Sequence, residues 1–278
     1  MDVDKWQQFH SGKWIGAKLI HKHVTGSTNL DAAALSGELP HGAVVVADQQ
    51  TAGRGRRGRT WASHAGENLY FSLLLKPDFQ PDMGPMLTLI MALAVAEGIE
   101  LAGDGTGRYV NEAQIKWPND IVIHGKKVCG ILTEMQLEAG QIKHVVIGVG
   151  VNVSHRAFAA EGLAHASSLE QELGGAWKSP ANPEAGIREQ LLRAILTQFE
   201  RYYEQFCQAG SLIPLRENYQ ARLVNLGREV QVLDPGGSFN GAALGIDEQG
   251  RLIVQKADGT VTKVYAGEVS VRGLYGYV

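Results

Sequence analysis

The segment AVVVADQQTAGRGRRGRTW, residues 43–61, joins a continuous apolar run to a loop of glycines and arginines. Residues 43–50 are typical of a buried β-strand, because they stay apolar until a short polar end. The run 53–59 then holds four arginines and three glycines. A second apolar run, NLYFSLLLKP at 68–77, follows. The sequence therefore predicts a cationic loop between two buried strands.

The three glycines of this loop, Gly53, Gly55 and Gly58, match the dinucleotide fingerprint G-x-G-x-x-G in spacing. That fingerprint needs a helix after the loop, and the sequence here indicates a loop and then a strand. A merely solvated loop would leave the glycines unexplained. Glycine loses more conformational entropy on folding than other residues, so it is favoured only where the backbone needs unusual dihedral angles or a close approach. Backbone N–H groups and arginine forks can converge on one anion. We therefore favour a loop that handles the anion of a small ligand.

The overall composition is that of an ordinary globular protein. The chain has 278 residues, of which 44% are hydrophobic and 20% charged, so it can bury a substantial core. Its net charge is -3 and its pI is near 6.3. A protein held to nucleic acid by bulk charge is usually basic. The arginine run is therefore a local concentration of positive charge in a chain that is slightly acidic overall.

The cysteine content and the apolar segments indicate in which cellular compartment the protein resides. The two cysteines, Cys129 and Cys207, are far apart, so they predict no disulfide framework or zinc site and indicate a reducing cytoplasm. The acidic N-terminus has no apolar region typical of a secretory signal. Residues 86–103 are apolar but contain Glu97 and Glu100. We interpret this run as a buried helix that is too short and too interrupted to span a bilayer.

The remaining pattern predicts alternating strands and helices up to about residue 224. Residues 13–35 are typical of a strand, a cap at Ser27, Thr28 or Asn29, and a helix. Two strands joined at 124–126 and a strand at 143–154 follow. A helix is expected from about Pro183 to Cys207, because apolar residues recur every four positions. Residues 174–186 are expected to form a surface loop.

The last fifty residues differ in character. From about residue 225 the sequence shows short strands with glycine and aspartate turns, typical of a small β-barrel. The expected organisation is a domain at 1–224 and a β-barrel domain at 225–278.

Four further short stretches each have a plain structural explanation. GSTN at 26–29 suits a helix cap, and KWPNDI at 116–121 suits a turn. In KKVCGIL at 126–132, Lys127 suits a hairpin end, and the glycines of GVGVNV at 148–153 suit a bulge. Their occurrence together and in this order has no such explanation.

Taken with the glycine–arginine loop, these stretches resemble the biotin protein ligases, also called biotin–acetyl-CoA-carboxylase ligases. The resemblance runs from about residue 20 to the C-terminus. It implies an α+β fold, with a mixed or antiparallel sheet flanked by helices as in class II aminoacyl-tRNA synthetases, and a C-terminal SH3-like β-barrel. Some members begin with a DNA-binding winged helix-turn-helix. Only about twenty residues precede the first strand here, so we expect the form without that module.

The resemblance implies a two-step reaction that uses ATP and Mg²⁺. Biotin is activated to biotinyl-5′-AMP, and biotin then passes to a lysine of a biotin carboxyl carrier domain. No covalent enzyme intermediate is needed, and no cysteine or serine sits in a nucleophile motif.

The site residues follow from the same resemblance. Those expected to bind biotin are Ser27, Thr28, Asn29, Gln50, Gly53, Arg54, Gly55, Arg56, Lys127 and Gly130. Those expected to bind ATP or the adenylate, a side that Asn29 also approaches, are Arg57, Arg59, Trp61, Asn119 and Asn152. Arg56 and Lys127 are the expected catalytic residues, and Asp120 is expected to help hold the metal or to orient the acceptor lysine.

Two alternatives stay open at this point. A lipoate or octanoate ligase would have a related fold but needs a longer apolar slot for its acyl chain. An RNA-binding module would use the arginines to contact phosphates, with affinity that falls steeply as salt rises. The ligase interpretation predicts no DNA partner, no membrane and a cytoplasmic location. Exposed edges of the predicted core sheet allow a homodimer.

Overall fold

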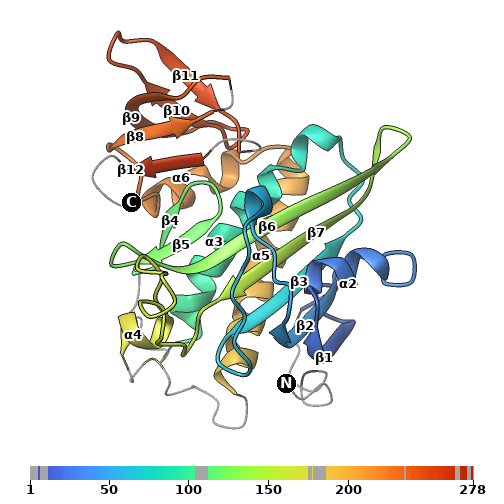
Figure 1. Ribbon diagram of the computed structural model, residues 1–278. Coiled ribbons are helices and arrows are strands. Elements are labelled where there is room, and N and C mark those ends of the chain that lie inside the picture. The colour runs from blue at the N-terminus through green and yellow to red at the C-terminus, as the bar shows by residue number, and fades with distance from the viewer. Residues whose placement is uncertain are drawn as a thin grey trace.

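The computed structural model describes residues 12–103, 112–174, 186–234, 236–266 and 270–273, together with Trp6, Trp177 and Tyr277 (Figure 1). The expected loop at 174–186 and the expected helix start at Pro183 fall largely outside these residues.

A seven-stranded mixed sheet forms the centre of the molecule, in the order β1-β2-β3-β7-β6-β5-β4. β1 and β2 are parallel, and all other neighbours are antiparallel. The strands are β1 (Leu19–Thr25), β2 (Ala43–Gln50), β3 (Leu69–Leu75), β4 (Gln114–Lys116), β5 (Asp120–Ile123), β6 (Lys126–Glu138) and β7 (Gln141–Val151). The predicted strands around the cationic loop and the predicted hairpin at 124–126 are therefore confirmed.

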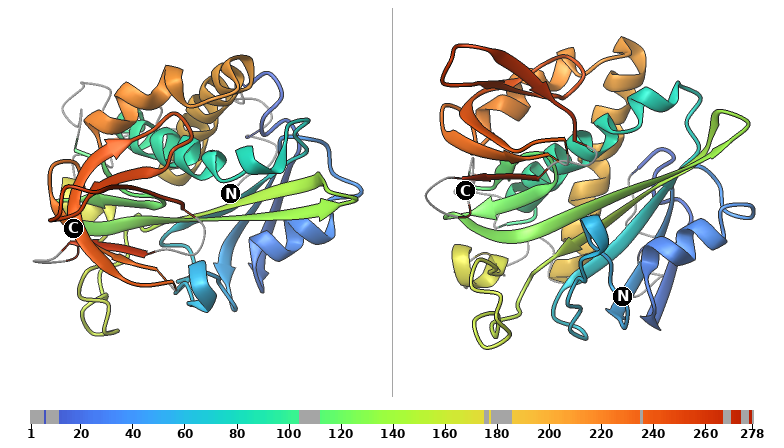
Figure 2. Two further views of the ribbon diagram at one scale, coloured as in Figure 1. Left: turned by 90° about the horizontal axis from the view of Figure 1, so that it is seen from above. Right: turned by 45° about the horizontal axis from the view of Figure 1, so that its top comes forward.

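Helices cover both faces of this sheet (Figure 2). α3 (Met86–Leu101) and α5 (Ile187–Ala209) lie on one face, and the short α2 (Thr28–Ala34) lies on the other. α5 buries Leu191, Ile195 and Phe199, as the four-residue spacing predicts. Its end is fixed by Gly210, whose φ of 64° suits a left-handed cap.

α3 buries every residue from Met86 to Ala96, so its apolar side chains surround the helix over that length, and only its last turns carry Glu97, Glu100 and the exposed Leu101. With the turn before it, the segment Pro81–Leu101 is long and apolar enough to cross a membrane by length and composition alone. The sequence-based argument that this apolar run is too short to span a bilayer is therefore not supported. Most of the segment is buried inside the protein, as in the core helix of a soluble protein.

The C-terminal part forms a second, five-stranded antiparallel sheet in the order β11-β10-β9-β8-β12. Its strands are β8 (Glu229–Leu233), β9 (Phe239–Ile246), β10 (Leu252–Gln255), β11 (Val261–Val264) and β12 (Ser270–Gly273). The predicted β-rich tail is confirmed, although no pairing among its described strands closes it into a barrel. The domain boundary at 224/225 stays a prediction.

Two short helices were not predicted: α4 (Leu169–Leu173) and α6 (Ile213–Ala221). The two sheets are joined by buried contacts. The Trp117 indole N–H, just before β5, donates to the Gly250 carbonyl at 3.0 Å. The outer edge of β4 pairs with the chain at Leu223. Within the described residues, that leaves β1 as the unpaired edge of the central sheet, and a homodimer stays a prediction.

Candidate active site

The cationic loop between β2 and β3 folds as a hairpin-like flap, defined here as residues 51–63. Its two arms meet in an antiparallel bridge between Arg54 and Thr60. The Trp61 N–H donates to the Gly53 carbonyl at 2.9 Å. A Cβ on Gly53 would lie 2.4 Å from the Trp61 carbonyl oxygen. Gly53 is therefore needed for the close approach of the two arms.

The flap crosses β6 and β7 (Figure 1), at a place where both strands carry glycine. Gly130 on β6 pairs with Gly150 on β7, and Gly148 lies two residues before Gly150 on the same face. The Trp61 ring rests on this patch. A Cβ on Gly130 or Gly150 would lie 2.7 or 2.6 Å from the ring. We call the narrow cavity above this floor the glycine slot.

Neutral polar groups line one end of the glycine slot, where β1 turns into α2. Ser27 occupies the N-cap of α2, yet its side chain makes no capping hydrogen bond, so its hydroxyl is not used by the helix. The Gln50 carboxamide oxygen accepts from the Thr28 N–H at 2.9 Å. The Ser72 hydroxyl donates to the Asn29 side-chain oxygen at 2.6 Å. These bonds fix the polar groups before any ligand arrives.

Arg54 is the first flap cation at this slot, and it has an acidic partner. Its guanidinium lies 2.9 Å from the Glu134 carboxylate. The Asn29 amide donates to the same carboxylate at 2.8 Å. Arg54 therefore belongs to a local network with Glu134 on β6.

A second cavity of about 460 Å³ lies on the other side of the flap and is bounded by the C-terminal sheet. We call it the cationic cavity. It is lined by Gly55, Arg56, Arg57, Arg59, Thr60, Trp61, Lys116, Trp117, Pro118, Asn119, Asp120, Lys127, His165, Val271, Arg272 and Tyr277. Among these residues Asp120 carries the one carboxylate, so positive charge dominates.

The slot and the cationic cavity share part of their lining. The residues common to both are Gly55, Arg56, Trp61, Asn119 and Lys127. The Arg56 guanidinium donates to the Asn119 side-chain oxygen at 2.9 Å and also to the Ala266 carbonyl. Burial lowers the pKa of Arg56, although Asp120 acts in the opposite direction. The two predicted catalytic residues therefore stand at the junction of the two cavities.

Lys127 is held at this junction by Asp120. The Lys127 ammonium lies 2.6 Å from one Asp120 oxygen, and the Tyr277 hydroxyl donates to the other at 2.7 Å. Burial alone would raise the pKa of Asp120, but Lys127, the Tyr277 hydroxyl and Lys116 together outweigh it and hold that pKa below its usual range. Asp120 is thus an ionised anchor for Lys127.

The expectation that Asp120 holds Mg²⁺ fits these contacts poorly. Both of its oxygens already have partners, and no group of three metal-binding side chains forms at either cavity among the described residues. Magnesium usually keeps several waters and binds through one or two carboxylates plus substrate phosphates. The described side chains therefore do not form a magnesium site of their own.

Eight residues that line the cationic cavity carried no site prediction, and four of them have titratable side chains: Lys116, His165, Arg272 and Tyr277. The Lys116 ammonium lies 3.3 Å from the centroid of the Tyr277 ring. Burial lowers the pKa of Lys116 to about 8. Lys116 is the first residue of the KWPNDI stretch. Its position close to Asn119 and Asp120 in sequence could therefore have indicated that it belongs to the site. Tyr277 gave none, because it reaches the site from the end of the chain.

Two predicted residues do not line either cavity. Gly53 serves the flap itself, as described above. The buried Asn152 side chain donates to the Ser167 carbonyl at 3.0 Å. The Ser167 N–H in turn donates to the Lys127 carbonyl at 2.9 Å. Asn152 therefore supports the chain beside Lys127, whereas the other predicted residues all line the slot or the cationic cavity.

Comparison with known proteins agrees with this geometry. Residues 21–152 match the model of the biotin/lipoate A/B protein ligase family, and residues 226–272 match the biotin protein ligase C-terminal domain. The first match sets the class as protein ligases for biotin or lipoate. The two matches cover the central sheet with its flap and the C-terminal sheet.

Individual relatives narrow that class. The bifunctional ligase/repressor BirA of Bacillus spizizenii is 37% identical over 92% of this chain and 75% of its own length. The biotin--[acetyl-CoA-carboxylase] ligase of Paracoccus denitrificans is 34% identical over 83% of this chain and 91% of its own. A biotin protein ligase from Aquifex aeolicus, solved with biotin and ATP, superposes with a TM-score of 0.73 at 28% identity, over 92% of this chain and 99% of that one. The chain belongs to the biotin protein ligase family.

Proposed function

We propose that this protein activates biotin with ATP to biotinyl-5′-AMP and transfers biotin to one lysine of a biotin carboxyl carrier domain. One observation carries the proposal. A narrow glycine-floored slot and a cationic cavity share five lining residues, Arg56 and Lys127 among them. Such a junction lets a carboxylate and a phosphate meet between two cations.

Biotin occupies the glycine slot. Its fused ring system lies on the backbone of Gly130 and Gly150, where no side chain intervenes. Its ureido group meets the preformed polar groups of Ser27, Thr28 and Gln50. Its carboxylate then points to the junction. A lipoate or octanoate ligase would need a purely apolar slot, and the polar lining supports biotin.

ATP occupies the cationic cavity. Arg57, Arg59, Lys116 and Arg272 surround the space for its phosphates, and Asn119 stands at the junction. Mg²⁺ arrives on the triphosphate and, when bound, neutralises part of its charge. The protein contributes position and further positive charge.

In the first step a biotin carboxylate oxygen attacks the α-phosphorus of ATP, and the bond to pyrophosphate breaks. Two anions repel each other on approach, so fixed cations at the point of contact lower the barrier. Arg56 and Lys127 supply those cations, and Asp120 orients Lys127. In the second step the amine of the acceptor lysine attacks the acyl carbon, loses a proton, and AMP leaves.

Trp61 changes place as biotin enters. Its ring rests on the floor of the slot, and its buried indole N–H has no hydrogen-bond partner among the described residues. A buried donor without a partner is costly, so this arrangement is poised for rearrangement. Movement of the flap then covers the mixed anhydride and shields it from water.

The test is to incubate the protein with biotin, Mg-ATP and a purified carrier domain. Mass spectrometry should show biotin attached to one lysine of the carrier. Lipoate should compete poorly with biotin in ATP–pyrophosphate exchange. Preference for lipoate, or no biotin transfer by a folded sample, would reject the proposal.

The cell compartment follows from the chemistry. Both cysteines are free, one buried and one exposed, which suits a reducing compartment. The cytoplasm also supplies ATP. We place the enzyme there.

A further inference from the structure

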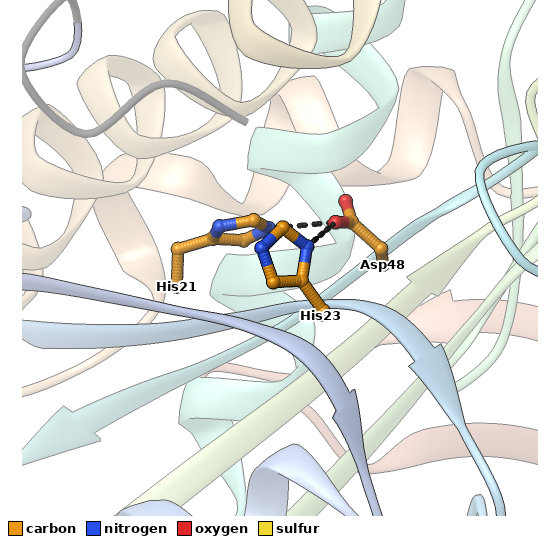
Figure 3. A group of neighbouring side chains, drawn as sticks. All are labelled: His21, His23 and Asp48. Carbon is orange, nitrogen blue, oxygen red and sulfur yellow. Dashed lines mark hydrogen bonds and ion pairs between the residues drawn. The ribbon is translucent and has the colours of Figure 1, made fainter.

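Two histidines and an aspartate meet on the parallel strand pair at the edge of the central sheet (Figure 3). His21 and His23 alternate on β1, so both side chains leave the same face. Asp48 lies beside them on β2. None of the three lines the glycine slot or the cationic cavity. The proposed ligase reaction therefore leaves this cluster without a role.

The donor atoms converge on one point. His21 Nε2 lies 2.9 Å and His23 Nδ1 lies 3.2 Å from the same oxygen of Asp48. Zinc bonds of about 2.0–2.2 Å in a tetrahedron place neighbouring donors roughly 3.4 Å apart. The observed separations come within a few tenths of an ångström of that spacing.

The orientation of the rings supports a shared ion. A metal lies in the plane of each imidazole that binds it, so the two planes must intersect at the ion. The His21 and His23 rings are inclined at 76°, with centroids 5.0 Å apart. Figure 3 shows a nitrogen of each ring directed at Asp48.

A second cluster in the molecule fails this requirement. His64 and His155 stack almost in parallel, at 10° and 3.7 Å between centroids. Parallel planes do not intersect, so one ion cannot bind both rings. His155 also uses both of its nitrogens, one toward Glu67 and one toward Glu161. This second cluster therefore serves as an internal comparison.

The surroundings favour the first cluster further. Arg188, in the first turn of α5, contacts the other oxygen of Asp48 at 3.3 Å and leaves the shared one directed at the histidines. Such contacts to the outer oxygen orient metal-binding carboxylates. The His23 side chain is 91% exposed and provides an entry path.

We infer that His21 Nε2, His23 Nδ1 and Asp48 Oδ2 form a binding site for one divalent transition-metal ion of the zinc type. Water completes the coordination. The ion ties the edge strand β1 to β2, so its effect is on stability. Nitrogen donors exclude Mg²⁺, which prefers oxygen.

The test uses untagged protein stripped with a chelator and titrated with Co²⁺ alone. The absorption of tetrahedral cobalt should saturate at one equivalent, disappear on addition of Zn²⁺, and persist in excess Mg²⁺. Zn²⁺ should also raise the melting temperature. Because His23 is exposed, His23→Gln should fold normally and bind at least about tenfold more weakly, since even second-layer partners contribute that much.

The matched control is His64→Gln, which alters the second histidine cluster and should bind cobalt as the wild type does. Absence of cobalt binding by the wild type would overturn the inference. Wild-type affinity in the His23→Gln variant, or lost binding in the His64→Gln variant, would overturn it equally.

Discussion

The glycine slot and the cationic cavity differ in size, floor and charge, although they share a border. The slot holds about 60 Å³ and is floored by sheet backbone, while the cavity holds about 460 Å³ and is ringed by cations. Trp61 lies across the slot and accounts for its small volume. A narrow slot with neutral polar groups at one end selects its ligand by shape and hydrogen bonds, whereas an open cavity ringed by cations attracts negative charge. The chemistry belongs to the border between them.

The largest expected effect follows from removing a cation at that border. Lys127→Ala should fold and lower the rate of biotin-dependent ATP–pyrophosphate exchange by about 100-fold or more, since one fixed electrostatic donor at a reacting centre contributes that much. Arg56→Ala should behave in the same way.

Lys126→Ala is the matched control, because Lys126 lies next in sequence but pairs with Glu172 away from the junction. It should retain nearly full exchange. Near-normal exchange by both the Lys127 and the Arg56 variants would remove the proposed role of the junction.

The next largest effect should show that the two cavities bind different substrates. In Gly150→Ala the new methyl group meets the slot floor, so the KM for biotin should rise about tenfold or more, as for one methylene misplaced in a binding pocket. The KM for ATP should change little. Gly37→Ala, where a Cβ meets nothing within 4 Å, is the control. Equal changes in both KM values would show that the cavities do not act separately.

A smaller effect concerns pH and Lys116. Phosphate binding favours the charged ammonium, so the KM for ATP should rise several-fold as pH passes upward through the lowered pKa of about 8. Lys116→Arg keeps its charge and should flatten this profile. A profile for Lys116→Arg that coincides with the wild type would assign the pH dependence to another group.

The same residue has a consequence for folding. Its folded-state pKa is lower than the usual 10.5, so the unfolded chain binds the proton more tightly. Lys116 therefore opposes folding below about pH 8, and its cost shrinks between pH 8 and 10.5. Urea unfolding of Lys116→Met should show a gain in stability at pH 7 that fades toward pH 10.

The smallest effect belongs to the C-terminus. Tyr277→Phe removes one hydrogen bond to Asp120 and should lower kcat by roughly two- to tenfold, the worth of a single such bond. Biotin affinity should not change. A loss as large as that of Lys127→Ala would mean that Tyr277 contacts the reacting groups directly.

Local signals in the sequence predicted much of this site. The strand at 43–50 ends as β2 does, and the arginines and glycines after it form the flap. Motifs carry such information because the turn between two adjacent strands is a local structure. The same holds for the two strands predicted to join at 124–126, because that hairpin brings Lys127 close to Asp120.

The sequence was least informative where distant parts of the chain meet. Tyr277 contacts Asp120 across 157 positions, which no local pattern encodes. Gly53 was expected to approach biotin, and this stays a prediction; the structure adds a constraint from the Trp61 carbonyl in the opposite arm of the flap. Asn152 was expected at the adenylate, and this stays a prediction; the structure shows its side chain donating to the Ser167 carbonyl. In each case the partner was set by tertiary packing.

The most direct test of the account is a crystal structure with a stable analogue of biotinyl-5′-AMP. The account predicts the ring system on Gly130 and Gly150, Trp61 displaced from that floor, and the linking group within hydrogen-bond reach of Arg56 and Lys127. A linking group out of reach of both side chains, or a ring system lodged in the cationic cavity, would contradict it.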